Sequence, residues 1–113
     1  MENFYYAKYH YFGDCSKAYT NVIIFATVKE DNFIKFSFSC SNKKDLYNKK
    51  LGRIKAFNRL NSTGHIFYVP VSDTLNKYKE IHKYLAEFVL KNTHIFPSWA
   101  ESVVLPRLLN YVC

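Results

Sequence analysis

The sequence contains few residues that break or cross-link a chain: 3 Gly, 3 Pro and 3 Cys among 113 residues. So little glycine and proline leaves no room for long loops or linkers, and the length suffices for one hydrophobic core but not for two. The cysteines are odd in number and share no spacing, so a disulfide framework of the secreted type is excluded. We therefore expect a single domain over residues 1–113 with reduced thiols.

Long hydrophobic runs are also missing. No stretch approaches the roughly 20 apolar residues that a membrane-spanning helix needs, so we expect no membrane partner. The segment Met1–Phe12 has neither the basic start nor the apolar run of a signal peptide. These absences predict a cytoplasmic protein.

Recognisable catalytic and metal-binding motifs are absent too. The chain has no Walker loop, dinucleotide fingerprint or serine nucleophile elbow, and its four His and three Cys lack the spacing of metal ligands. His82 falls on the apolar face of a predicted helix, where a hydrogen-bonded core histidine is the ordinary outcome. Cys15 and His10 are the residue types of a nucleophile and its base, but nothing in the sequence places them together. We expect no enzyme activity, no cofactor and no metal site.

Positive charge and aromatic residues are what the chain has in excess. The net charge is +7, and residues 43–59 hold seven basic residues against Asp45 alone, a net of +6. A basic stripe on an otherwise balanced domain is typical of a surface that binds an anion, although a solvated helix face has the same composition. Ten Tyr and ten Phe supply rings for a core or for stacking on a base.

The apolar pattern predicts an α+β fold in which an antiparallel sheet of about four strands packs against helices, in the order βββ-α-β-α-α. The run Val22–Phe25 is typical of a central strand that is buried on both sides, and the alternation in Phe33–Ser41 predicts a strand with one buried face. Pro70 places the fourth strand at an edge. The strands are expected in Phe4–Phe12, Ala18–Val28, Phe33–Ser41 and His65–Val71; the later helices are expected from Ser72 or Asp73 to about Lys91 and from Ser98 onward, with Pro106 kinking or restarting the last one.

The basic segment itself predicts a helix over Lys44–Leu60, capped by Asn42 or Ser41. Its apolar stripe contains Tyr47, Leu51 and Ile54, widened by Leu46, Phe57 and Leu60. Gly52 and Ala56 form a second strip of small residues on another side, flanked by Lys49 and Arg59. Glycine inside a helix costs about 1 kcal/mol relative to alanine, so either close backbone packing or a ligand against the helix is expected to offset it.

The stretch from Phe38 to Leu60 resembles a box in small bacteriophage and prophage proteins of unassigned function. There a strand that ends in Cys-Ser is followed by Lys-Asp, an aromatic residue, Lys or Arg, Gly-Arg, Ala and Arg-Leu. The matching positions are Cys40, Ser41, Lys44, Asp45, Tyr47, Lys49, Gly52, Arg53, Ala56, Arg59 and Leu60. The resemblance implies a phage protein that acts in the host cytoplasm, and small phage proteins without enzyme motifs often resemble counter-defence factors.

Charge, aromatics and this resemblance together predict a non-enzymatic counter-defence protein that sequesters a nucleotide or cyclic oligonucleotide immune signal. Lys44, Lys49, Arg53 and Arg59 are expected to bind phosphate, because cationic side chains form charge-assisted hydrogen bonds with its oxygens. Tyr47, or aromatic residues of the first strand, would stack on a base. Arg107 is expected to complete the site, across a dimer if the chain is a homo-oligomer.

Two alternatives remain open. A basic helix can also track the phosphates of RNA or DNA, including a guide RNA, which makes an anti-CRISPR inhibitor a second reading. The helix can instead dock an acidic bacterial defence protein. Arg53 also has a purely structural interpretation, in which its side chain pairs with a carboxylate such as that of Glu80 or Glu87.

Overall fold

The computed structural model describes residues 6–17, 19–30, 33–44, 48–68 and 77–112, with only the backbone described at residues 77 and 108–112. The strands are β1 (Lys8–Gly13), β2 (Val22–Lys29), β3 (Phe33–Ser41) and β4 (His65–Tyr68). The helices are α1 (Lys49–Asn58), α2 (Lys77–Lys91) and α3 (Ala100–Val112), with short 3₁₀ turns η2 (Arg59–Asn61) and η3 (Thr93–Ile95).

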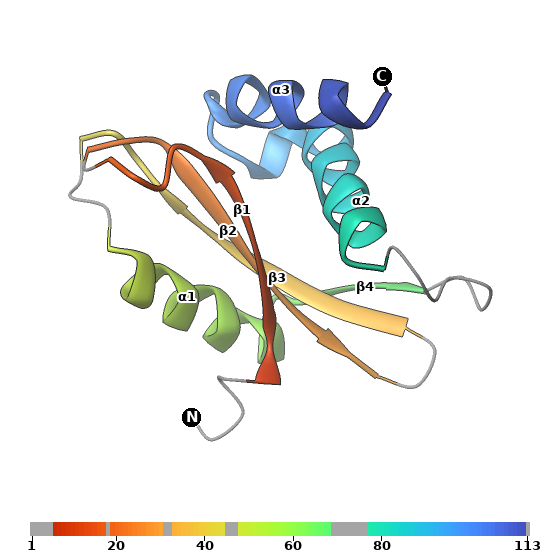
Figure 1. The fold of residues 1–113 in the computed structure, drawn as a ribbon. Coiled ribbons are helices and arrows are strands. Elements are labelled where there is room, and N and C mark those ends of the chain that lie inside the picture. The colour runs from red at the N-terminus through yellow and green to blue at the C-terminus, as the bar shows by residue number, and fades with distance from the viewer. Residues whose placement is uncertain (1–5, 18, 31–32, 45–47, 69–76, 113) are drawn as a thin grey trace.

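The strands form one antiparallel sheet, and their order across it, β1-β2-β3-β4, is their order along the chain. Figure 1 shows this sheet as a middle layer with α1 on one side and with α2 and α3 on the other. The predicted α+β class and element order are confirmed.

The register leaves one end of β3 with a strand on a single side. β2 pairs with β3 along its whole length, from Val22 opposite Ser41 to Lys29 opposite Ile34. β4 pairs only with the first part of β3, from Phe33 opposite Tyr68 to Phe36 opposite His65. Residues 37–41 of β3 therefore have no second neighbouring strand within the described part of the chain.

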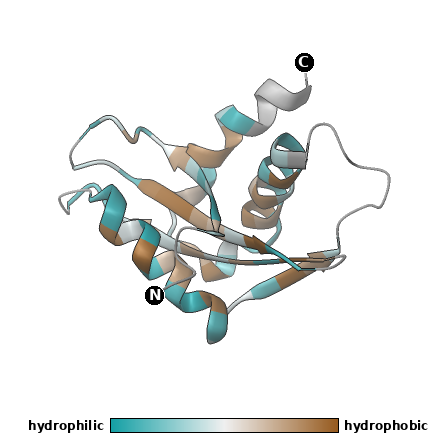
Figure 2. Cartoon of the chain, turned by 60° about the horizontal axis from the view of Figure 1, so that its bottom comes forward, coloured by the Kyte–Doolittle hydropathy of each residue, from teal (hydrophilic) through white to brown (hydrophobic). Residues whose placement is uncertain are grey.

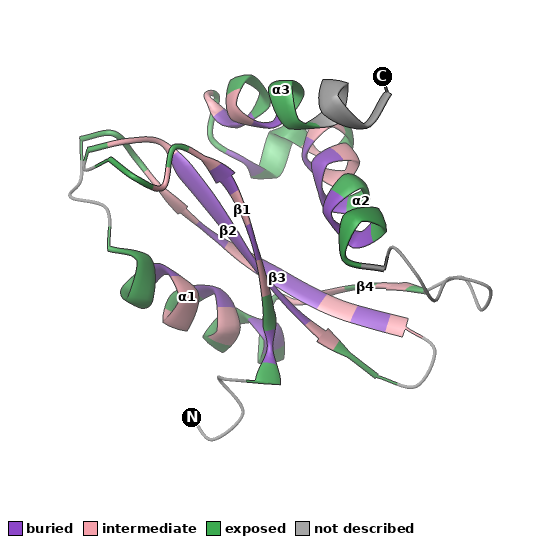
Figure 3. Cartoon of the chain, in the orientation of Figure 1, coloured by how far each residue is buried: buried purple, intermediate pink, exposed green. Residues whose placement is uncertain are grey.

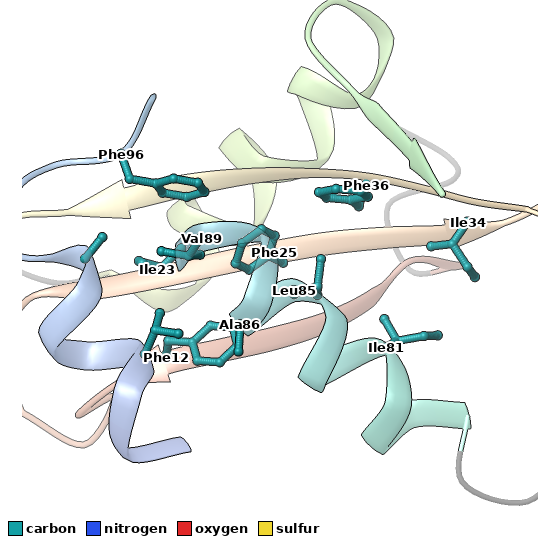
Figure 4. Packing of buried hydrophobic residues seen from close by; sticks show 12 residues of the cluster. Phe12, Ile23, Phe25, Ile34, Phe36, Ile81, Leu85, Ala86, Val89 and Phe96 are labelled. Carbon is teal, nitrogen blue, oxygen red and sulfur yellow. The ribbon is translucent and has the colours of Figure 1, made fainter. Parts of the chain in front are cut away.

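The side of the sheet that carries α2 and α3 holds the larger core. Phenylalanine rings from three strands interlock here: the Phe12 and Phe25 centroids lie 5.8 Å apart edge to face, and Phe25 and Phe36 lie 6.1 Å apart. Leu85 and Val89 of α2 are fully buried against these rings, as Figure 4 shows. Burial of large apolar side chains at about 25 cal/mol per Å² makes this the main source of stability.

The other side of the sheet is closed by α1, which approaches through its small residues. Gly52 and Ala56 are the buried positions of this helix, and they pack with Val22, Ile24 and Ala26 of β2. A Cβ at Gly52 would lie 2.6 Å from Ile24 Cδ1, so the helix sits where only glycine fits without a shift. Close backbone packing is thus what offsets the cost of this glycine.

The approach of α1 corrects two predictions. The helix begins at Lys49 with Asn48 as its cap, whose side chain accepts a hydrogen bond from the Leu51 amide at 3.0 Å, so neither Asn42 nor Ser41 caps it. The predicted apolar stripe faces the core only in part: Leu60 is buried and Phe57 packs beside it, but Leu51 is 48% exposed. The small-residue strip faces the sheet, because it allows closer contact than leucine does.

That same approach explains why β3 is not half-buried as its alternation predicted. Ser37 and Ser39 are buried beneath α1, and Ser39 Oγ donates a hydrogen bond to the Gly52 carbonyl at 2.8 Å. β2 is buried along most of its length, as predicted, and Figure 3 shows it covered from both sides. α3 runs as one helix through Pro106. The predicted contributions of Pro70, Ser72 and Asp73 lie outside the described residues.

Candidate functional site

The basic residues of α1 and of the turn after it lie on two flanks. Lys49 and Arg53 point toward β1 and form the β1 flank. Lys55 and Arg59 lie toward the unpaired end of β3 and form the β3 flank. Gly52, against the sheet, lies between them. Figure 2 shows hydrophilic residues prominent on α1 beside the hydrophobic strands.

The β1 flank is built from two stacked pairs of a cation and a tyrosine. Lys49 Nζ lies 4.7 Å from the centroid of the Tyr11 ring, and Arg53 Cζ lies 5.7 Å from that of Tyr9. The spacing follows from the two elements, since residues four apart share a helix face and residues two apart share a strand face. Each ring attracts the cation above it and holds that side chain over the sheet.

Arg53 retains hydrogen-bonding capacity in this arrangement. Its Nε is buried and has no acceptor among the described residues. Glu80 and Glu87 belong to α2, which lies on the opposite side of the sheet, so the alternative in which Arg53 pairs with one of them is wrong. A guanidinium held beside an aromatic ring is a suitable group for an incoming oxyanion.

A pocket of about 660 Å³ opens beside Tyr11, where β1 ends. Gly13 turns the chain here with a φ of +113°, in the left-handed region that favours glycine. Val103, Pro106 and Arg107 of α3 form the other wall. Tyr11 thus belongs both to the β1 flank, where Lys49 lies over its ring, and to this pocket, whose other wall holds Arg107.

Two ionisable groups of this pocket have displaced pKa values. Burial raises the pKa of Tyr11, and the Arg53 guanidinium close to its phenol opposes that rise, so Tyr11 is neutral at pH 7. Hydrogen bonds from Ser16 lower the pKa of Asp14, whose carboxylate also lies 3.6 Å from Lys17 Nζ. The pocket therefore has a cationic wall at Arg107 and an anionic one at Asp14.

The remaining predicted site residues lie elsewhere. Arg59 donates a hydrogen bond to the Phe38 carbonyl at 2.9 Å, on the far side of β2 from Tyr11. Lys44 is exposed in the turn after β3, and Tyr47 lies outside the described residues. The structure therefore brings Lys49 and Arg53 together over Tyr11 and Tyr9, places Arg107 of α3 across the pocket from Tyr11, and separates Arg59 from all three.

The aromatic residues of the first strand were predicted to stack on a base, but the prediction did not distinguish Tyr9 and Tyr11 from the others. The available signal was their spacing of two, which places both rings on one face of a strand. Asp14 and Ser16 of the pocket gave no sequence signal, and Cys15 was considered only as a nucleophile, because a short loop acquires its neighbours only through the fold.

The two residues weighed as a nucleophile and its base are on opposite sides of the sheet. His10 is buried on the α2 side, where its Nδ1 lies 3.1 Å from Nδ1 of His82, and Cys15 packs on the α1 side. Burial lowers the pKa of His10 to about 3, with the neighbouring His82 adding to the effect, and lowers that of His82 to about 4. His82 is thus a hydrogen-bonded core histidine.

No group of three or more His, Cys, Asp or Glu side chains in the described part of the chain is placed to hold a metal ion. Among the described helices, none is long and apolar enough to cross a membrane. Comparisons with protein-family models, curated proteins and solved structures found no match. The resemblance of residues 38–60 to phage proteins therefore stays a prediction.

Proposed function

We propose that this chain binds a nucleotide or cyclic oligonucleotide without transforming it, at the β1 flank and the adjoining pocket. The observation that carries the proposal is the placement of Lys49 and Arg53 over Tyr11 and Tyr9, beside a pocket whose far wall holds Arg107. Cations held over rings lose less conformational freedom on binding than free surface lysines do.

The pocket suits the base and sugar of such a ligand. Its volume of about 660 Å³ lies within the usual range for small-molecule sites, and Val103 and Pro106 give it apolar walls. Arg107 on one side and the β1 flank on the other supply separate cationic groups. This spacing favours a ligand with more than one phosphate, and the Asp14 carboxylate is an acceptor for a ribose hydroxyl.

For a phage-encoded protein, such binding would withdraw a nucleotide immune signal from the host, which is the counter-defence role that the resemblance implies. The ligand would be held unchanged, in keeping with the prediction of no enzyme activity. One chain supplies both Tyr11 and Arg107, so the site does not require a second copy. Homo-oligomerisation stays a separate prediction.

Native mass spectrometry with cyclic dinucleotides, cyclic trinucleotides and mononucleotides tests the proposal. We expect a discrete added mass of one of these ligands, and recovery of that ligand with unchanged mass. A recovered ligand of altered mass would instead identify an enzyme. The same spectra report the oligomeric state.

Charge reversal then locates the site. We expect Lys49→Glu and Arg107→Glu each to weaken binding by about tenfold or more, because each reverses a phosphate contact. The matched control is Lys50→Glu, which makes the same charge change at an exposed position of α1. Equal loss in all three variants, with a steep dependence on salt, would favour polymeric RNA or DNA over a small ligand.

A further inference from the structure

We propose that the outer edge of β3, over residues 38–41, binds an extended acidic segment of another protein as an added strand. This site is separate from the nucleotide site, since it lies at the β3 flank of α1, and the proposal does not depend on nucleotide binding. Its basis is the early end of β4, which covers β3 only as far as Phe36.

Two hydrogen bonds establish which backbone groups of β3 face outward. The Glu30 amide donates to the Phe33 carbonyl at 3.0 Å, so Phe33 and every second residue after it point toward β2. The intervening residues point away from β2, and Arg59 Nη1 reaches the Phe38 carbonyl from that outer side. Phe38 N–H and both backbone groups of Cys40 therefore face the open edge, where the described residues provide no strand to pair with them.

The β3 flank supplies positive charge along this edge. Arg59 donates a hydrogen bond to the Phe38 carbonyl, in the position that a backbone N–H of an added strand would take. Lys55 lies farther along β3, beside residues 39–41. No carboxylate of the described residues lies within salt-bridge distance of Arg59 or Lys55. An added strand with acidic side chains would pair with both cations while its backbone pairs with β3.

Two hollows on the edge suit the side chains of such a strand. One, of about 270 Å³, is lined by Ser39, Gly52 and Lys55 on the α1 side. The other, of about 360 Å³, lies next to Phe38, His65 and the 41% exposed Ile95. Successive side chains of a strand point to opposite faces, so acidic and apolar residues in alternation fit the edge.

The charge also decides against a second copy of this chain as the occupant. Two copies paired edge to edge about a two-fold axis would bring Arg59 and Lys55 near the same residues of the other copy. Like charges in such a position are unfavourable. An acidic partner removes this repulsion and gains attraction from the same side chains.

The probe is a capped peptide of roughly eight residues in which Glu and Val alternate, a usual strand length. We expect it to bind, and we expect the amides of Phe38 and Cys40 to exchange with solvent more slowly when it does. The amides of Ser37 and Ser39, which face β2, are expected to be protected already. A peptide with N-methylated backbone amides and a Lys-Val peptide are the controls, and both are expected to fail to bind.

Charge reversal of the protein provides the second test. We expect Lys55→Glu to weaken peptide binding by about tenfold, and Arg59→Glu to weaken it similarly. Lys55→Glu breaks no hydrogen bond to the strand, so its effect stands even if Arg59→Glu disturbs the fold. The matched controls are Lys83→Glu, exposed on α2, and Lys49→Glu at the nucleotide site. Both are expected to bind the peptide as the unaltered protein does.

The proposal would be overturned by absence of peptide binding, by equal binding of the N-methylated peptide, or by amide protection at Phe38 and Cys40 that rises with protein concentration alone. The last result would assign the edge to a second copy. Loss of peptide binding in Lys49→Glu but not in Lys55→Glu would place the contact at the β1 flank, and it would also overturn the proposal.

Discussion

The two sides of the sheet are closed in different ways. On the α2 side, large rings and aliphatic chains such as Phe25, Phe36 and Leu85 fill a thick layer. On the α1 side, Gly52 and Ala56 bring a helix so close that a serine hydroxyl reaches the helix backbone. The packing on the α2 side depends on the volume of the buried side chains, and the packing on the α1 side depends on how closely the helix approaches the sheet. A helix seated by its small residues keeps its long polar side chains for the surface, which is why α1 carries cations on both flanks.

The largest expected difference between the two sides is in the response to truncation of a leucine. Leu85→Ala removes a fully buried side chain of α2 and is expected to cost about 2–5 kcal/mol of the free energy of unfolding. Leu51→Ala on α1 makes the same chemical change at a 48% exposed position. We expect it to change the free energy of unfolding by no more than about 0.5 kcal/mol. Urea unfolding measures both, and equal costs would contradict the placement of α1.

Acid is expected to act on the α2 side through the buried pair His10 and His82. The folded protein binds their protons only at pH values near 3 and 4, whereas the unfolded chain binds them near 6.5. The unfolded state therefore holds more protons in between, and stability falls as the pH drops from about 6.5 toward 4. The slope is at most about 1.4 kcal/mol per pH unit for each proton.

The variant His10→Phe isolates this contribution from that of the carboxylates. It removes one titrating group while keeping a ring against Tyr78, which stacks on His10 at 4.2 Å. We expect the free energy of unfolding to fall less steeply between pH 6.5 and 4 than in the unaltered protein. If the free energy of unfolding depended on pH in the same way in both proteins, protonation of His10 and His82 would not be the cause of the acid sensitivity.

On the α1 side, a double-mutant cycle between Gly52 and Ile24 tests how closely the helix approaches the sheet. Gly52→Ala alone is expected to destabilise by about 1–3 kcal/mol, because overpacking outweighs the gain in helix propensity. Ile24→Val removes the Cδ1 atom that lies 2.6 Å from the new Cβ. In that background Gly52→Ala is expected to be neutral or stabilising, and additive effects in urea unfolding would contradict the close approach.

The smallest expected effect concerns the hydrogen bond between Ser39 and the Gly52 carbonyl. Ser39→Ala removes it and is expected to cost about 1 kcal/mol of the free energy of unfolding. Ser41→Ala on the same side of β3 is the matched control, with a cost expected within about 0.5 kcal/mol. A difference too small to measure by thermal or urea unfolding would mean that water replaces the bond.

Much of the fold could be predicted from the sequence, because the strand segments have clear hydrophobic patterns. The run Val22–Phe25 predicted a strand buried on both sides, and Phe33–Ser41 was predicted with the bounds that the structure has. The inward face of α1 was predicted only in part. The strip of Gly52 and Ala56 was identified, with close packing as one of two explanations, but hydrophobicity favoured Leu51, and the benefit of Gly52 depends on the distance to Ile24. That distance is a property of the packed structure.

For the candidate site, the sequence predicted only that basic residues are concentrated in one segment. Seven cations in seventeen residues indicated an anion-binding helix, but their division into two flanks depends on how α1 lies across the sheet. Arg107 and Tyr11 are distant in the chain and meet only because α3 packs by the end of β1. Such long-range neighbours leave no local pattern.

The order of the strands also bears on how fast the chain folds. Each strand pairs with the next one along the sequence, and only residues 30–32 separate β2 from β3 in the chain. Pairings between near neighbours close short loops and lower the entropic barrier to folding. We expect the β2–β3 hairpin to be structured in the folding transition state, with α1 docking onto it. Substitutions at the hairpin would then slow folding, whereas substitutions in α3 would mainly speed unfolding.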